Sequence, residues 1–445
     1  MTFIQLFQFI LSISILVGLH ELGHFIPAKL FKARVEKFYL FFDPWFSLVK
    51  KKIGDTEYGI GWLPFGGYVK IAGMVDESMD TEQLSKPPQP WEFRSKPAWQ
   101  RLIIMMGGVT VNFFLAWFIY SSLSYFNGET FHENAKFENG IAASPAAKKM
   151  GLKTGDQILK IDGKTADRME TSTINMLFAN DVTVLRDGKE VTFPVNEDGV
   201  ADVLAENEAK AYFSPRFPVV IDSLLPSGTA KAAGLMKGDK IVGINGKPIK
   251  YFDELVSELS QFKNQNVVLG VERNSARQAI DVKVDQKGEL GFAADSSVIQ
   301  QEFEKTRVKK QYTLAEAIPR GLTRTIDVLT MQIKQFKIVF NTKTEGYKKV
   351  SGPIGIIKQM PTEVNWEFFW SFTAMFSVWL AFLNLIPIPG LDGGHVVFTL
   401  WEMITGKPVP QKVLENAQMV GVIFLLGLMI VIFGNDILKL IMDKF

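Results

Sequence analysis

Four long runs of uncharged, mostly apolar residues interrupt an otherwise mixed sequence. Each run is close to the roughly 20 residues that an α-helix needs to cross the hydrocarbon core of a bilayer. Soluble proteins rarely contain four such runs, so the pattern predicts membrane-spanning helices rather than the buried helices of a large soluble core. The predicted spans cover residues 3–27, 102–126, 368–387 and 416–434.

The position of the first run would also suit a secretory signal peptide, but two features argue against this interpretation. Residues 1–28 contain no Lys or Arg, so the positively charged start of a signal peptide is missing. The run also contains two histidines and a glutamate that cleavage would discard. Lys and Arg cluster after the first run and before the second, which predicts that residues 30–100 are cytoplasmic. The N-terminus and residues 129–366 are then external.

The region between the second and third predicted spans contains an internal repeat. Residues 144–164 and 227–247 are identical at 11 of 21 positions, with an offset of 83 residues. Each copy predicts a short helix, a Gly-Leu-x-x-Gly-Asp turn and a strand that ends in Asp-Gly or Asn-Gly, which are strong hairpin signals. An offset of this length indicates a duplicated domain rather than a short solenoid repeat.

Apolar residues recur every three to four positions between residues 313 and 340, after the repeat. This spacing predicts a mostly helical, amphipathic stretch that Pro319 interrupts. The sequence allows either a helix in the membrane interface or one that packs against the duplicated domains.

Composition narrows the possible chemistry. The 445 residues include no cysteine, which excludes disulfides, thiol nucleophiles and Cys-ligated metals. Lys plus Arg total 49 and Asp plus Glu total 47, and this near balance argues against a nucleic-acid-binding protein. A metal site would have to use carboxylates and the four histidines of the chain.

Two of these histidines lie inside the first predicted span, in the sequence His20-Glu21-Leu-Gly-His24. On a helix, residues i and i+4 share a face, so both imidazoles can bind one ion at about 2.0–2.1 Å from each nitrogen. Glu21 lies next to that face and can act as a general base toward a water that the metal activates. Ionisable residues inside a span are costly and are therefore functional candidates. The alternative is a polar pair that closes a helix end near the interface.

A catalytic zinc needs a third protein ligand and one open position. Pro387 and Pro389 end the third predicted span, and irregular backbone at membrane depth is tolerated only where it lines a cavity or is buried in protein. Asp392 follows them at about the expected depth of the two histidines, so we expect it to be the third ligand. His395 is the alternative ligand, or else it forms hydrogen bonds to the ligands. His132 lies on the opposite side in the predicted topology.

These motifs resemble those of the site-2 protease family of intramembrane zinc metalloproteases. The resemblance rests on His-Glu-x-x-His in the first span and on Asn-x-x-Pro-x-Pro-x-Leu-Asp-Gly, which begins at Asn384. Four spans around an external repeat are similar to the RseP-like branch, where the repeat is two PDZ domains. The resemblance covers essentially the whole chain. It implies an α-helical integral membrane protein with four transmembrane helices, a re-entrant β-hairpin and two external α+β PDZ domains.

The family motifs also imply roles for individual residues. The cofactor would be Zn²⁺, with His20, His24 and Asp392 as its ligands and Glu21 as the catalytic carboxylate. The implied substrate-binding residues are Asn384, Pro387, Pro389, Gly66, Gly67, Tyr68 and Asn112.

Three further segments resemble sections of the family. Residues 58–70 are similar to its re-entrant β-hairpin, whose edge strand could pair with an unwound substrate helix. In the second span Val109 replaces the proline of the family motif that ends at Asn112. Gly288-Glu-Leu-Gly-Phe292 is similar to a PDZ carboxylate-binding loop, and Ser351-Gly-Pro-Ile-Gly355 is similar to a segment to which we assign no chemistry.

The expected organisation has five regions, and the membrane metalloprotease is formed by the first and the last of them. They are residues 1–127 (the N-terminal half of the membrane metalloprotease, with a cytoplasmic hairpin at about 58–72), 128–217 (PDZ domain 1), 218–300 (PDZ domain 2), 301–366 (amphipathic helical connector) and 367–445 (the C-terminal half of the membrane metalloprotease).

The resemblance implies a zinc metalloendopeptidase of the bacterial inner membrane, with its active site near the cytoplasmic face. It would cleave the transmembrane segment of a single-span membrane protein, such as an anti-sigma factor or a remnant signal peptide, after external trimming. The PDZ domains would exclude large substrates or bind a new peptide C-terminus, or else only form a wall over the membrane region. The alternatives are a non-catalytic PDZ scaffold with a structural metal and a metal transporter, although transporters usually show inverted repeats among their spans.

Overall fold

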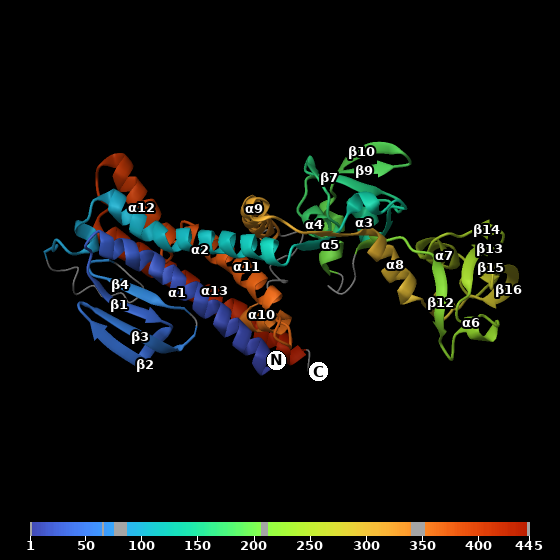
Figure 1. The fold of residues 1–445 in the computed structure, drawn as a ribbon, viewed down its shortest axis with the longest axis horizontal. Coiled ribbons are helices and arrows are strands. Elements are labelled where there is room, and N and C mark those ends of the chain that lie inside the picture. The colour runs from blue at the N-terminus through green and yellow to red at the C-terminus, as the bar shows by residue number, and fades with distance from the viewer. Residues whose placement is uncertain (1, 65, 75–86, 206–211, 340–351, 443–445) are drawn as a thin grey trace. The chain divides into compact units, whose positions relative to one another are not determined.

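The structure, a computed structural model, describes residues 2–64, 66–74, 87–205, 212–339 and 352–442 (Figure 1). The chain divides into two units. We call the unit of residues 1–128, 311–336 and 350–445 the helical unit, and the unit of residues 129–310 and 337–349 the repeat unit.

Four described helices of the helical unit are long and apolar enough to cross a membrane, and each coincides with most or all of one predicted span. α11 ends at Leu385, two residues earlier than predicted, because the residue before Pro387 is forced into an extended conformation. α13 begins earlier and ends later than predicted. The four helices are α1 (Phe3–Leu30), α2 (Ala98–Phe126), α11 (Trp366–Leu385) and α13 (Gln411–Met442).

α2 packs against both α1 and α11 and so lies at the centre of this unit. Small residues allow its close approach to α1. A Cβ atom on Gly107 would lie 1.9 Å from the carbonyl oxygen of Gly23, so only glycine fits there. Ser12 of α1 and Thr373 of α11 are joined by a hydrogen bond of 2.9 Å between their hydroxyl groups. The three helices therefore hold one another through close backbone contact and buried polar pairs.

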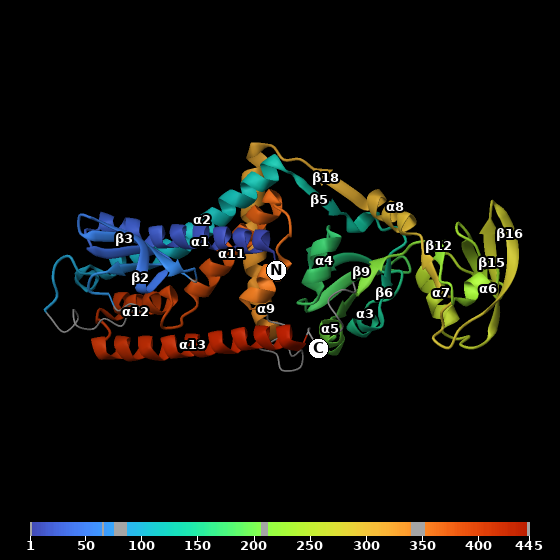
Figure 2. The same cartoon turned by 90° about the horizontal axis from the view of Figure 1, so that it is seen from below.

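A four-stranded sheet lies beside the C-terminal half of α1 (Figures 1 and 2). Its order is β2-β3-β1-β4, with β1 parallel to β3 and antiparallel to β4. The expected hairpin at about 58–72 is therefore wrong, because its two strands, β3 and β4, are separated by β1, which pairs with both. The sequence analysis missed β1, which pairs with β3 and β4 rather than with its neighbour along the chain, and also β2, which pairs with β3. The strands are β1 (Val35–Leu40), β2 (Phe42–Ile53), β3 (Thr56–Leu63) and β4 (Tyr68–Ile71).

α9 (Leu314–Val339) is one continuous helix, so the expected interruption at Pro319 is wrong. Proline in the second turn removes only one backbone hydrogen bond, which the packing offsets. The indole nitrogen of Trp117 donates to the carbonyl of Ile318 at 2.9 Å, and Val328 and Leu329 pack on the core between α2 and α11. The amphipathic stretch thus packs against α2 and α11 of the same unit. The remaining helices of this unit are η1 (Phe93–Ser95), α10 (Pro353–Gln359) and α12 (Asp392–Thr405).

The first copy of the repeat lies in a small α+β fold with a sheet of order β10-β9-β7-β8 and its own apolar core. Two strand pairs, β5 with β18 and β6 with β11, adjoin it. Its strands are β5 (Glu129–His132), β6 (Ile141–Ala143), β7 (Gln157–Ile161), β8 (Lys164–Thr165), β9 (Asp181–Arg186), β10 (Lys189–Pro194), β11 (Phe213–Pro215) and β18 (Arg307–Lys310). Its helices are η2 (Asn134–Lys136), α3 (Pro145–Met150), α4 (Met169–Met176) and α5 (Glu197–Ala205).

The second copy forms a similar fold around a second core, with a sheet of order β16-β15-β13-β12-β17 and with β14 paired to β13. Its strands are β12 (Val219–Leu224), β13 (Lys240–Ile244), β14 (Lys247–Pro248), β15 (Asn266–Arg273), β16 (Ala276–Lys283) and β17 (Phe292–Ala294). Its helices are α6 (Thr229–Ala232) and α7 (Phe252–Leu259), and α8 (Ser296–Thr306) follows.

The repeated Gly-Asp dipeptide forms the same buried contact in both copies. The carboxylates of Asp156 and Asp239 are at most 1% exposed, and each pairs with an arginine at 2.7 Å, Arg186 and Arg273 respectively. Each aspartate also accepts a backbone N–H three residues earlier in the chain. The identity between the two copies thus preserves an ion pair that joins the turn to a neighbouring strand.

We expect Asp239→Ala to destabilise the second copy by about 2 kcal/mol, because the backbone N–H of Met236 and the Arg273 guanidinium lose their acceptor. The Arg273 guanidinium holds the pKa of Asp239 below its usual range. The stabilisation is therefore complete above the unfolded pKa of about 3.9 and is lost as the pH falls through the lower native value. Pulse proteolysis of the full chain in urea, at pH 7 and at about pH 3, measures both effects. Asp281→Asn on exposed β16 is the control, and equal urea midpoints for the two variants would contradict the prediction.

Candidate metal centre

α1 places three ionisable side chains of the predicted motif within little more than one helical turn. His20 and His24 are 7% and 6% exposed, and their Nε2 atoms lie 3.2 Å apart. Glu21 lies beside them and lines the same cavity. The regular i, i+4 geometry of an uninterrupted helix is sufficient to aim both imidazoles at one point.

The turn between α11 and α12 brings Asp392 to the two histidines. Gly390 has a φ of +101°, a conformation that L-residues rarely adopt, and α12 begins two residues later. A Cβ atom on Gly393 would lie 2.2 Å from the carbonyl oxygen of Ile386, so α12 folds back tightly on the turn. Oδ2 of Asp392 lies 3.3 Å from Nε2 of His20 and 3.3 Å from Nε2 of His24.

These three atoms fit a zinc ion. A tetrahedral site with bonds of about 2.0–2.1 Å has ligand atoms about 3.3 Å apart, which matches the three distances between His20, His24 and Asp392. Oδ2 of Asp392 is buried and makes no hydrogen bond with any described residue, so a cation would satisfy it. Among the described residues, no other group of three or more His, Asp or Glu side chains meets the same geometric requirement.

α2 supplies the groups behind the histidines. Nδ1 of His24 donates to the carbonyl oxygen of Ile104 at 2.8 Å. Nδ1 of His20 lies 3.1 Å from Nδ2 of Asn112, whose Oδ1 is buried without a hydrogen-bond partner among the described residues. A histidine that binds metal through Nε2 carries its proton on Nδ1, so rotation of the Asn112 amide would pair both groups. Asn112 thus lies behind a ligand in the structure, whereas the sequence assigned it to the substrate.

A glycine on α2 leaves room for the two imidazoles. A Cβ atom on Gly108 would lie 2.4 Å from Nε2 of His24 and 2.6 Å from Cε1 of His20. Any larger residue at this position would displace the ligands. α2 therefore supports the site both through hydrogen bonds and through the space that Gly108 leaves for the imidazoles.

A cavity of about 720 Å³ opens onto the three candidate ligands. Gly66, Gly67 and Tyr68 line it from the sheet, and Asn384 lines it from α11, with its Nδ2 3.2 Å from Nε2 of His20. A Cβ atom on Gly67 would lie 2.6 Å from the carbonyl oxygen of Tyr39, so a glycine is needed for this approach. Five of the predicted catalytic and substrate-binding residues therefore share one cavity with the ligands.

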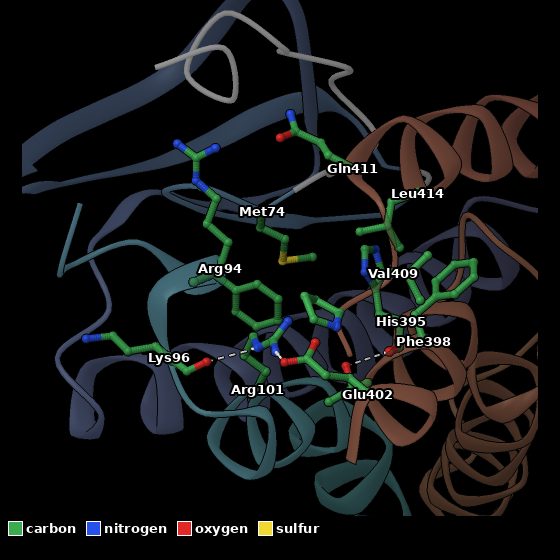
Figure 3. Close-up of a pocket in the computed structure, with 14 residues that line it drawn as sticks. Met74, Arg94, Lys96, Arg101, His395, Phe398, Glu402, Val409, Gln411 and Leu414 are labelled. Atoms are coloured by element: carbon green, nitrogen blue, oxygen red, sulfur yellow. Dashed lines mark hydrogen bonds and ion pairs between the residues drawn. The ribbon is translucent and has the colours of Figure 1, made fainter. Parts of the chain in front are cut away.

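Two predicted substrate-binding prolines lie outside this cavity. Pro387 and Pro389 are not among the described residues that line the cavity, and they instead shape the turn that leads to Asp392. The alternative ligand His395 lies on α12, one turn beyond Asp392. It lines both this cavity and a neighbouring cavity of about 280 Å³, where Arg101 of α2 forms an ion pair with Glu402 of α12 (Figure 3).

Sequence reasoning missed two groups at this site. The carbonyl of Ile104 carries no signal, because any residue provides a carbonyl oxygen. Gln418 of α13 lines the cavity and is 5% exposed. Its signal was available, since a polar side chain within an apolar span is a functional candidate.

Comparison with known proteins is consistent with this geometry. The sequence model of peptidase family M50 matches residues 8–428. The chain is 28% identical to the regulator of sigma-E protease RseP of Escherichia coli K12, over 98% of this chain and 99% of that protein. It is also 28% identical to the regulator of sigma E protease of Haemophilus influenzae, over 97% and 98% respectively. A Vibrio cholerae relative, 27% identical over the same shares, is described by its name as a zinc metalloprotease.

We expect Asn112→Ala to lower zinc affinity by about 10–100-fold, because His20 loses the group that fixes its ring orientation. Zinc content of the purified full chain, measured during titration with a competing chelator, tests this. Thr110→Ala is the matched control, since Thr110 is exposed on the same helix. Unchanged zinc affinity in Asn112→Ala would show that Asn112 does not support the ligand.

Proposed function

Because the chain belongs to peptidase family M50, the site-2 protease family, we propose that it hydrolyses a peptide bond within the transmembrane segment of single-span membrane proteins. The chain is a zinc-dependent membrane metalloprotease, and the proposal concerns its substrate and its catalytic residues. The proposed substrates are an anti-sigma factor or a remnant signal peptide that has already been trimmed outside the membrane.

One observation carries the proposal. Two histidines of α1 and Asp392 of α12 converge with zinc-ligand spacing next to the carboxylate of Glu21, and α1 is long enough to cross a bilayer. A metal that only stabilised the fold would require a closed site, whereas this one opens onto a large cavity. This difference favours catalysis over the scaffold alternative.

The proposed mechanism assigns a task to each side chain. His20, His24 and Asp392 would hold Zn²⁺, which supplies a Lewis acid that polarises the scissile carbonyl and lowers the pKa of water. Glu21 takes the proton from the attacking water and then donates it to the leaving amine. The amide of Asn384, beside His20 in the cavity, can donate a hydrogen bond to the substrate carbonyl.

A transmembrane helix hides its peptide bonds and must be extended before water can attack. β4 is the terminal strand of its sheet, and its residues Tyr68–Ile71 line the cavity. Terminal strands are templates for pairing with an extended chain. We infer that β4, together with Gly66 and Gly67, holds an unwound segment of the substrate across the metal centre.

We further propose that the two copies in the repeat unit are PDZ domains that exclude substrates with large external domains. Their duplication, their α+β folds and their separate cores support this assignment. The family and the distribution of positive charge favour the bacterial inner membrane, with the repeat unit outside and the metal centre near the cytoplasmic face.

Glu21→Gln should lower cleavage by at least about 100-fold while zinc stays bound, because the amide cannot take a proton and the ligands are intact. The assay is co-expression with a tagged single-span substrate that lacks its external domain, together with metal analysis of the purified protein. Glu363→Gln, at an exposed position, is the control. Full activity of Glu21→Gln would rule out the assigned role.

Deletion of residues 130–300 should allow cleavage of substrates that still carry their external domains, because the proposed size filter is gone. Immunoblots of trimmed and untrimmed substrate in the same cells measure the change. The same deletion combined with Glu21→Gln should cleave neither, which would assign the new activity to this chain. If the deletion variant cuts trimmed substrate alone, the repeat unit is not a size filter.

A further inference from the structure

α13 contacts its neighbours at few points. Many of its apolar side chains are exposed, including Val420 at 67% and Ile430 at 73%, as expected for a helix that faces lipid. Gln418 is an exception, because it is polar, 5% exposed and located on the side that lines the catalytic cavity. A buried amide in a transmembrane helix is costly unless it forms hydrogen bonds.

The amide of Gln418 has a specific partner. Its Oε1 accepts a hydrogen bond from the backbone N–H of Gly390 at 3.2 Å, in a buried contact. One turn further along α13, a Cβ atom on Gly421 would lie 1.5 Å from the carbonyl oxygen of Pro389. α13 therefore meets the Pro389–Gly390 turn directly, with a side-chain acceptor and with a glycine that leaves space for the turn.

This turn determines the position of Asp392. Gly390 precedes Asp392 by two residues, and its φ of +101° sets the direction in which its N–H points. Backbone groups outside regular helix have no water to bind at membrane depth, so the protein must supply a partner. The Asp392 carboxylate is only two residues from Gly390. Rotation of the Gly390 peptide would therefore move this carboxylate.

We propose that Gln418 is a positioning residue for the third metal ligand. Its amide oxygen holds Gly390, and thereby keeps the carboxylate of Asp392 directed at His20 and His24. The inference rests on the proposed assignment of Asp392 as a zinc ligand, and it goes beyond that assignment by giving α13 a role in metal binding. The Gln418 side chain acts through Gly390 and takes no part in proton transfer.

Zinc affinity of the purified full chain tests the proposal independently of proteolysis. Gln418→Met keeps the length of the side chain and removes the acceptor, whereas Gln418→Glu keeps an acceptor oxygen. We expect Gln418→Met to bind zinc about 10–100-fold more weakly in competition with a chelator, and Gln418→Glu to recover most of that loss. Circular dichroism shows whether each variant keeps its helices.

Gln8→Met is the matched control, because Gln8 is another buried transmembrane glutamine, whose amide donates to the backbone of Pro361 far along α1 from the metal centre. Wild-type zinc affinity in Gln418→Met, or an equal loss in Gln8→Met, would overturn the proposal.

A further variant separates this result from the ligand assignment on which it depends. Asp392→Asn should lose zinc more completely than Gln418→Met, because it removes a ligand rather than its support. If Asp392→Asn keeps wild-type affinity, the ligand assignment itself is wrong and the proposal for Gln418 is overturned with it. If Asp392→Asn loses zinc and Gln418→Met does not, only the positioning role is overturned.

Discussion

The close contact between α1 and α2 at Gly23 and Gly107 is the interaction on which the metal centre depends. Without side chains at these positions the two backbones touch, and small residues are what allows such contact between membrane helices. Only at this separation can the carbonyl of Ile104 and the amide of Asn112 reach the far nitrogens of the two histidines. The packing of two helices thus sets the orientation of both imidazoles.

The second constraint is the absence of water around irregular backbone in a bilayer. The turn that follows α11 has to exist, because a straight helix would carry Asp392 away from the histidines. Its exposed peptide groups then need partners from the protein. Tight folding of α12 at Gly393 and the approach of α13 at Gly421 provide this enclosure. The ligand set is therefore completed by helices from both ends of the chain.

The repeat unit is stabilised by different contacts. Each copy has its own apolar core, and the same buried Asp–Arg pair joins the Gly-Asp turn to a strand in both. Its stability therefore depends on contacts within each copy, and its chemistry contains no counterpart of the metal centre among the described residues. This separation is consistent with the proposed roles, in which the helical unit hydrolyses the substrate and the repeat unit selects it by size.

Features that depend on local pattern could be predicted from the sequence. The lengths of the apolar runs located four helices able to cross a membrane, the i, i+4 spacing located the histidines, and the family resemblance, which the comparisons confirm, pointed to Asp392. The groups that support these residues could be identified only from the packing of the helices and strands. The sheet around β1, the unbroken helix through Pro319 and the contact of Gln418 with Gly390 all arise from pairing between distant or non-adjacent segments. Periodicity in the sequence indicates which face of a helix is apolar. The atom that a given side chain contacts on a neighbouring helix depends on how the helices pack.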